Sequence, residues 1–345
     1  IICNPYKMST VFYIFLLFIF FILKKFRCFA RVRAFRLFYA NGNAGAHFAK
    51  GCRIMRQAHI ILLQSLILRL FPGGRAAKRQ TERCDLFMLD QMIGLAPPLQ
   101  ALIATLFTWL ITALGALPVL FMRNTRPRLL RCMFGFSAGV MLASAFFSLL
   151  APAAEYARLI RIPEYLPLCA GFAAGCLLLP CADLVQRFAD KRRPKSAASL
   201  VLAITLHNIP EGMAIGVAVG SAAAGDKAAF AAACILALGI GIQNFPEGAA
   251  VALPLRACGC SKRKAFFIGQ LSGLAEPIAG IAGAFAVAAS KSIRPLMLAF
   301  AGGAMIGAAS GELLPRCGEA QEEPRAFLAF AAGFILMMLL DTALG

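Results

Sequence analysis

The chain has 345 residues, of which 60% are hydrophobic and only 15% are charged, and its formal net charge is +19. Its mean hydropathy is +0.75. This composition excludes an ordinary soluble domain, in which about 25% of the residues are charged. The sequence therefore predicts an all-α polytopic membrane protein with the lipid bilayer as its surroundings.

The first 90 residues form a basic, Phe-rich extension of different character. They carry 15 Lys or Arg against 3 acidic residues, which supplies +12 of the net charge. Ser9 to Leu23 is an apolar run that ends in Lys24-Lys25-Phe26-Arg27, a pattern shared by short spans, signal anchors and interfacial helices. Basic charge without a fold motif is weak evidence for nucleic acid, so we predict no nucleic-acid partner. Because the chain begins with Ile1, we expect translation to start near Met88 or Met92.

The remaining region, residues 95–345, is predicted to be one membrane domain. It contains eight apolar runs of about 20 residues, the length that a helix needs to cross a bilayer, and the connections between them are short. The runs lie at about 99–121, 132–152, 166–184, 199–220, 228–254, 265–288, 295–314 and 325–344.

Positive charge orients these runs, because Lys and Arg collect in cytoplasmic loops. The loops after the first, third, fifth and seventh runs hold 15 such residues: Arg123, Arg126, Arg128, Arg131, Arg187, Lys191, Arg192, Arg193, Lys195, Arg256, Lys262, Arg263, Lys264, Arg316 and Arg325. The opposite loops hold 5: Arg158, Arg161, Lys227, Lys291 and Arg294. We therefore expect a cell inner membrane protein whose first helix starts outside the cytoplasm and whose C-terminus also lies outside.

Two related hexapeptides occupy the fourth and fifth runs. They are His207-Asn208-Ile209-Pro210-Glu211-Gly212 and Gln243-Asn244-Phe245-Pro246-Glu247-Gly248. Their polar members fall at i, i+1 and i+4, so on a helix the first and last share a face and the middle one lies about 100° round. A carboxylate inside a hydrophobic span costs roughly 3 kcal/mol and usually marks an ion or proton path.

A third carboxylate lies at the same predicted depth. Glu276 falls near the middle of the sixth run and, like Glu211 and Glu247, stands next to a proline. Proline frees a backbone carbonyl, and irregular backbone at membrane depth is tolerated where it lines a cavity. We expect these prolines to open the helices at the polar site, and the three carboxylates to converge on one or two cations.

The side chains offered by these segments suit a divalent metal ion. One imidazole, three carboxylates and the amide oxygens of Asn208, Gln243 and Asn244 favour Zn²⁺, Fe²⁺, Mn²⁺, Co²⁺ or Cd²⁺, whereas Cu(I) would prefer sulfur ligands. A purely structural role, in which His and Asn join helices by hydrogen bonds, is the alternative. Repetition at matched depth on helices of opposite direction argues against it.

The paired hexapeptides H-N-x-P-E-G and Q-N-x-P-E-G, together with Gly269–Gly280 (GQLSGLAEPIAG), resemble the ZIP (Zrt/Irt-like) divalent-metal transporters, in particular a bacterial GufA-like subgroup. The resemblance covers about residues 95–345. It implies a 3+2+3 bundle of eight helices with inverted repeats, and an elevator-like or rocking alternating-access motion.

The resemblance also implies a binuclear site. It assigns His207, Glu211, Gln243, Glu247 and Glu276 to one ion, and Asn208, Glu211, Asn244 and Glu247 to an adjoining ion, with Met141 as a further residue that approaches the first. Asn244 is neutral where some relatives have Asp, so the second ion would be held by one charge fewer. A secondary exit site near the end of the seventh helix would rest on Glu312 alone, which could equally extend to the interface.

These observations predict a transporter that imports Zn²⁺, with no covalent chemistry and no cofactor. An intramembrane metalloenzyme is the first alternative, because His207 and Glu211 are spaced i, i+4, but the chain lacks H-E-x-x-H and further nitrogen or sulfur ligands. A metal-gated channel or a carrier of a non-metal solute is the second. We also consider a homodimer, for which the sequence carries no readable signal.

The charge pattern makes the orientation testable. Cysteines placed at positions 192 and 262 should resist membrane-impermeant thiol reagents in intact cells, whereas a cysteine at 227 should react, because Arg192 and Lys262 belong to the basic loops and Lys227 to the opposite set. Modification of position 192 without modification of 227 would overturn this orientation.

Overall fold

The computed structural model describes residues 92–122, 127–189, 197–222, 226–318 and 324–344. By its internal contacts the chain forms two compact units, one of which comprises Pro97–Ala223 and Ala228–Gly345. The predicted extension over residues 1–90 lies outside the described residues and stays a prediction.

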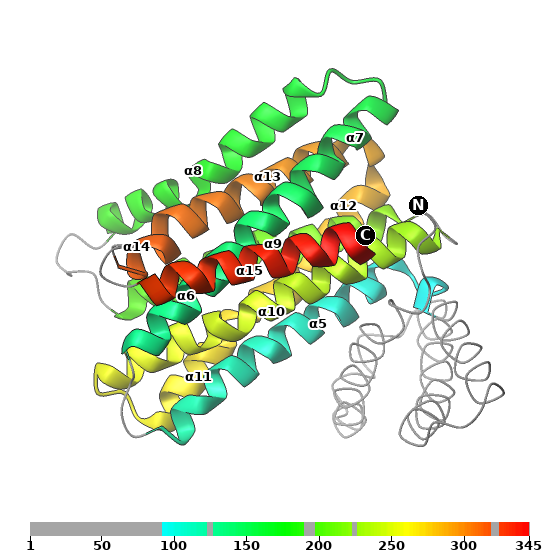
Figure 1. Ribbon diagram of the computed structural model, residues 1–345. Helices are drawn as coiled ribbons and strands as arrows, with labels where there is room; N and C mark the ends of the chain where they lie inside the picture. The colour runs from blue at the N-terminus through cyan, green and yellow to red at the C-terminus, as the bar shows by residue number, and fades with distance from the viewer. Residues whose placement is uncertain (1–91, 123–126, 190–196, 223–225, 319–323, 345) are drawn as a thin grey trace. The chain divides into compact units, whose positions relative to one another are not determined.

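All regular structure in the described residues is helical (Figure 1). The first half contains α5 (Pro97–Ala116) with the 3₁₀ turn η1 (Leu117–Leu120), α6 (Pro127–Ser144) with the π-helical segment η2 (Ala145–Leu150), α7 (Ala151–Leu159) and α8 (Tyr165–Ala189). Two central helices follow, α9 (Ala197–Ser221) and α10 (Lys227–Ala257). The second half contains α11 (Lys262–Ser272), α12 (Ala275–Ala289), η3 (Lys291–Ile293), α13 (Arg294–Ala308), the π-helical segment η4 (Ala309–Leu313), α14 (Leu314–Arg316) and α15 (Pro324–Leu344).

Seven stretches of the described residues are helices long and apolar enough to cross a membrane. They correspond to the predicted runs with the exception of the fourth, which forms α9. The side chains of α9 are described from Thr205 onward. The prediction of an all-helical polytopic membrane protein is confirmed, while the number eight stays a prediction.

Helices of the first half of the chain pack in pairs with helices of the second half. α6 lies along α15, and α8 lies along α13 (Figure 1). Close backbone approach is equivalent in the two pairs: a Cβ on Gly139 would lie 2.0 Å from the Phe330 carbonyl oxygen, and a Cβ on Gly303 would lie 2.2 Å from that of Phe172. Small residues at such interfaces let helix backbones meet where lipid provides no hydrophobic drive.

The two π-helical segments also lie at matching positions in the two halves. The segment η2 begins at Ala145 and η4 begins at Ala309. Ala145 follows Gly139 by the same number of residues as Ala309 follows Gly303. Each long helix that starts at Pro127 or Arg294 thus changes to π geometry at the matching position. Equivalent contacts and equivalent π segments in the two halves are the arrangement expected of inverted repeats.

The glycine that ends each hexapeptide explains how the central helices reach their neighbours. A Cβ on Gly212 would lie 2.3 Å from the backbone oxygen of Glu276, and a Cβ on Gly248 would lie 2.0 Å from that of Thr112. Neither distance can hold a side chain. α9 therefore packs directly on α12, and α10 directly on α5, beside the predicted ligands.

This contact predicts the effect of adding a single methyl group. Gly212→Ala should lower the thermal unfolding midpoint of the purified protein, because an overpacked interface typically costs about 1–3 kcal/mol. Gly307→Ala is the matched control, since its Cβ would lie 3.5 Å from the nearest atom, the Cα of Cys176, an ordinary contact. Equal midpoints for the two variants would contradict the packing described here.

Candidate metal centre

The predicted ligands from the two hexapeptides are buried on α9 and α10. His207 is 5% exposed, Glu247 is 4% exposed, and Asn208, Glu211, Gln243 and Asn244 are 1% exposed or less. The variable residue of each hexapeptide, by contrast, faces outward: Ile209 is 39% exposed and Phe245 is 41% exposed. The sequence pattern of polar and apolar positions therefore turns every polar member inward, as helical periodicity requires.

The three amides use their nitrogen atoms to bind other parts of the protein. Asn208 Nδ2 donates to the Ser272 carbonyl at 2.8 Å, which occupies a carbonyl at the end of α11. Gln243 Nε2 donates to Glu211 Oε1 at 2.7 Å, and Asn244 Nδ2 donates to Glu276 Oε1 at 2.8 Å. The nitrogen atoms are thus committed to the protein, and each amide oxygen is left without a hydrogen-bond partner.

Most of the unpartnered buried polar atoms in the described residues belong to these side chains. Of ten such side-chain nitrogen or oxygen atoms, six are His207 Nε2, Asn208 Oδ1, Glu211 Oε2, Gln243 Oε1, Asn244 Oδ1 and Glu247 Oε2. The five oxygens are acceptors, and the imidazole nitrogen can serve as one. Leaving such a group unpaired costs about 1–3 kcal/mol. One nitrogen with several carboxylate and amide oxygens is a donor set that suits a divalent cation.

Glu276 is held differently from the other two carboxylates. It lies in the first turn of α12, after the helix that starts at Lys262 breaks between Ser272 and Ala275. Thr108 donates its hydroxyl to Glu276 Oε2, while Asn244 occupies Oε1. A carboxylate at a helix N-terminus is also stabilised by the helix dipole. Sequence reasoning missed Thr108, although its place among three buried threonines of α5, Thr105, Thr108 and Thr112, was a possible signal.

The prolines affect the helices less than expected. Pro210 and Pro246 lie inside α9 and α10, which continue without interruption. Neither helix is interrupted at its proline, and the expected opening at the polar site stays a prediction. An interruption occurs before Glu276-Pro277, at Gly273 and Leu274, where a Cβ on Gly273 would lie 3.1 Å from Thr112 Oγ1 of α5.

The carboxylates do not form a complete metal site by themselves. Among the described residues, no group of three or more His, Cys, Asp or Glu side chains is close enough to hold a metal ion. Glu211 accepts a hydrogen bond from Gln243 Nε2, and Glu276 accepts one from Asn244 Nδ2. The predicted convergence of three carboxylates on one or two cations stays a prediction.

Helix α6, which packs on α15, also contacts the predicted ligands. Ser137 is buried, and its hydroxyl lies 3.4 Å from both Glu247 Oε1 and the Gln243 carbonyl oxygen. Met141 lies one turn further along α6, on the same face as Ser137, and is 1% exposed. Its predicted approach to the metal stays a prediction.

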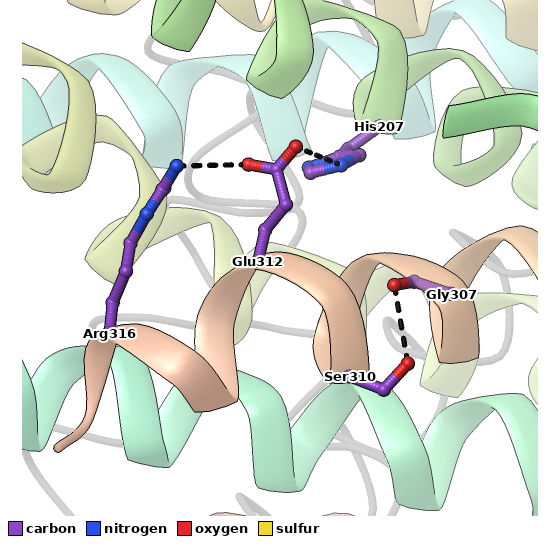
Figure 2. Close-up of polar contacts among 5 residues, drawn as sticks. All are labelled: His207, Gly307, Ser310, Glu312 and Arg316. Atoms are coloured by element: carbon purple, nitrogen blue, oxygen red, sulfur yellow. Dashed lines mark hydrogen bonds and ion pairs between the residues drawn. The ribbon is translucent and has the colours of Figure 1, made fainter. Parts of the chain in front are cut away.

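Glu312 is not the isolated residue that the sequence suggested. It lies in η4, and Figure 2 shows its carboxylate between Arg316 and His207. Glu312 Oε2 is 3.1 Å from an Arg316 guanidinium nitrogen, and Oε1 is 3.7 Å from His207 Nε2. Its side chain is 16% exposed. Sequence spacing could not reveal this contact, because the π geometry of η4 alters which face Glu312 occupies.

Comparison with known proteins identifies the family of this chain. The family model described as ZIP Zinc transporter matches residues 184–341. Zinc transporter ZIP11 of Bos taurus is 35% identical over 73% of this chain and 99% of its own length. Zinc transporter ZIPB of Bordetella bronchiseptica is 39% identical over 68% of this chain and 78% of its own length, and zinc transporter GufA of Myxococcus xanthus is 36% identical over 71% and 98%. The chain belongs to the ZIP family of membrane metal transporters.

Proposed function

We propose that this protein imports Zn²⁺ into the cytoplasm through a binuclear site between α9, α10 and α12. The observation that carries the proposal is the set of five buried oxygen atoms on the two hexapeptides that have no hydrogen-bond partner, together with the buried His207 Nε2, whose charged neighbour is Glu312 at 3.7 Å. Such a set is costly in a bilayer unless a cation visits it. The names of the relatives, all zinc transporters, support zinc as the cargo.

The donor atoms divide between two ions in a consistent way. His207, Glu211, Gln243, Glu247 and Glu276 would serve the first ion, and Asn208, Glu211, Asn244 and Glu247 the second. Glu211 and Glu247 would bridge the two ions. In each carboxylate Oε1 contacts a neighbouring side chain, Gln243 or Ser137, and Oε2 has no hydrogen-bond partner. A site with a single imidazole among oxygen donors also accepts Fe²⁺, Mn²⁺, Co²⁺ and Cd²⁺. Preference for zinc over these ions therefore depends on His207.

Transport rather than catalysis is the activity that this donor set favours. A hydrolytic zinc site uses three His, Cys or carboxylate ligands in open tetrahedral geometry with a base for the bound water. Here most donors are amide and carboxylate oxygens, which release ions more readily than thiolate or imidazole cages do. A channel is distinguished from a carrier by flux that does not saturate with Zn²⁺ concentration.

The shared carboxylates should be the most sensitive positions. We expect Glu211→Ala or Glu247→Ala to reduce Zn²⁺ uptake into proteoliposomes to near background, because either change leaves both ions short of a ligand. The measurement is uptake in parallel with the number of bound Zn²⁺ per chain. Glu164→Ala is the matched control: Glu164 is a partly exposed acid paired with Arg158 on the surface, where an ion pair is worth little.

Two further variants separate the ions. His207→Ala should weaken uptake of Zn²⁺ more than that of Mn²⁺, because nitrogen donors favour zinc. Asn244→Asp should tighten the second ion and change the maximal rate. Wild-type uptake and stoichiometry in both Glu211→Ala and Glu247→Ala would show that the hexapeptides serve packing only, and the proposed function would be wrong.

A further inference from the structure

Thr108 of α5 contacts two side chains, Glu276 of α12 and Asn244 of α10, which also contact each other. Its hydroxyl contacts Glu276 Oε2, and its backbone carbonyl lies 3.4 Å from Asn244 Nδ2. Asn244 Nδ2 in turn donates to Glu276 Oε1 at 2.8 Å. All three side chains are fully buried. Residues from α5, α10 and α12 thus form a closed ring of polar contacts that no residue of the hexapeptides could make alone.

The single hydroxyl proton of Thr108 has two acceptors within reach. One is the Thr105 carbonyl, at 3.0 Å, and the other is the closer Glu276 carboxylate. A carboxylate is the stronger acceptor, because hydrogen bonds to a charged group are shorter and roughly twice as strong. Thr108 therefore donates its hydroxyl hydrogen bond to Glu276. This bond fixes the position of the carboxylate at the start of α12.

The ring also fixes which end of Asn244 faces the ion. An asparagine can bind a cation only through its oxygen, since its NH₂ group is a donor. Here Nδ2 is directed to Glu276 and to the Thr108 carbonyl, and Oδ1 is left without a partner. If Glu276 moved, the main acceptor that holds Nδ2 would move with it.

We propose that Thr108 is a positioning residue of the metal site, which holds Glu276 directly and, through Glu276, turns the oxygen of Asn244 toward the second ion. The proposal rests on the proposed function, because it assumes that Glu276 and Asn244 face the transported cation. Thr108 itself does not touch the metal. Residues that orient metal ligands in this way typically contribute 10–100-fold to metal affinity.

The same helix supplies two matched controls. Thr105 and Thr112 are buried like Thr108, but their hydroxyls bond within α5: Thr105 Oγ1 donates to the Ala101 carbonyl at 2.7 Å, and Thr112 Oγ1 lies 3.3 Å from the Thr108 carbonyl. Replacing any of the three by valine removes one hydroxyl and adds one methyl group. The three variants therefore differ in whether the lost hydroxyl served Glu276.

The experiment compares Zn²⁺ affinity by calorimetry and the concentration dependence of uptake for the full chain and its variants. Thr108→Val should bind zinc about 10- to 100-fold more weakly and should raise the KM for uptake, while Thr108→Ser, which keeps the hydroxyl, should restore both. Thr105→Val and Thr112→Val should behave like the unchanged protein. An unchanged Thr108→Val, a Thr108→Ser variant as weak as Thr108→Val, or an equal loss in all three valine variants would overturn the proposal.

A double-mutant cycle tests the route through Glu276. If Thr108 acts on the metal by holding this carboxylate, Thr108→Val should cause no further loss of affinity in a Glu276→Ala background, whereas independent effects would add. If Thr108→Val does not fold, Thr108→Cys replaces it, because a thiol of similar size is a weak donor. Zinc affinity equal to that of the unchanged protein in Thr108→Cys would then refute the proposal.

Failure of this proposal can be told apart from failure of the proposed function. Should Glu276→Ala bind and transport zinc normally, Glu276 is not part of the metal site, and the site assignment itself is wrong. If Glu276→Ala loses affinity and Thr108→Val does not, the site stands and only the positioning role of Thr108 is refuted.

Discussion

Unpaired acceptor atoms inside a hydrophobic bundle are the constraint around which this protein is built. Each such atom costs about 1–3 kcal/mol, and six of them lie on α9 and α10. The amide nitrogens of the same side chains are all bonded to protein, so the cost falls selectively on oxygens and on one imidazole nitrogen. A fold that merely needed helix contacts could have paired both ends of each amide. In the proposed function, a transported cation would offset this cost.

The helices around the site are placed so that backbones, rather than side chains, meet. Gly212 lets α9 touch the backbone of Glu276, and Gly248 lets α10 touch that of Thr112. These contacts bring the carboxylate-bearing turn of each hexapeptide against the neighbouring helix, where donors such as Thr108 are within reach. The glycine at the end of the hexapeptide is thus part of the site, because any side chain there would force the polar ring apart.

Polar contacts also cross between the groups of helices that pack separately. α6 approaches α10 through Ser137, and η4 approaches α9 through Glu312 and His207. Both contacts involve a predicted metal ligand, so ion binding and the relative position of the groups share the same side chains. The π geometry of η4 matters here, because it places Glu312 toward His207 within an otherwise α-helical span.

Sequence reasoning succeeded where the physics is local. Apolar runs of bilayer length identify the spanning helices, since the cost of burying polar backbone and side chains depends on composition and length. Helical periodicity turns His207, Glu211, Gln243 and Glu247 inward and Ile209 and Phe245 outward, as the exposed fractions show. The equal depth of Glu276 also follows from counting along a span, and family membership is carried by the hexapeptides themselves.

The contacts that complete the site depended on tertiary structure. Which face α5 turns toward α12 cannot be derived from an evenly apolar helix, so Thr108 could not be distinguished from Thr105 or Thr112 in the sequence. The break before Glu276, the uninterrupted course of α9 and α10 through their prolines, and the contact between Glu312 and His207 likewise result from neighbouring helices. The sequence alone determined the class of protein and the inward-facing polar side chains of the two hexapeptides, because these depend on composition and helical repeat. Only the packing of one helix against another decided which donors orient them.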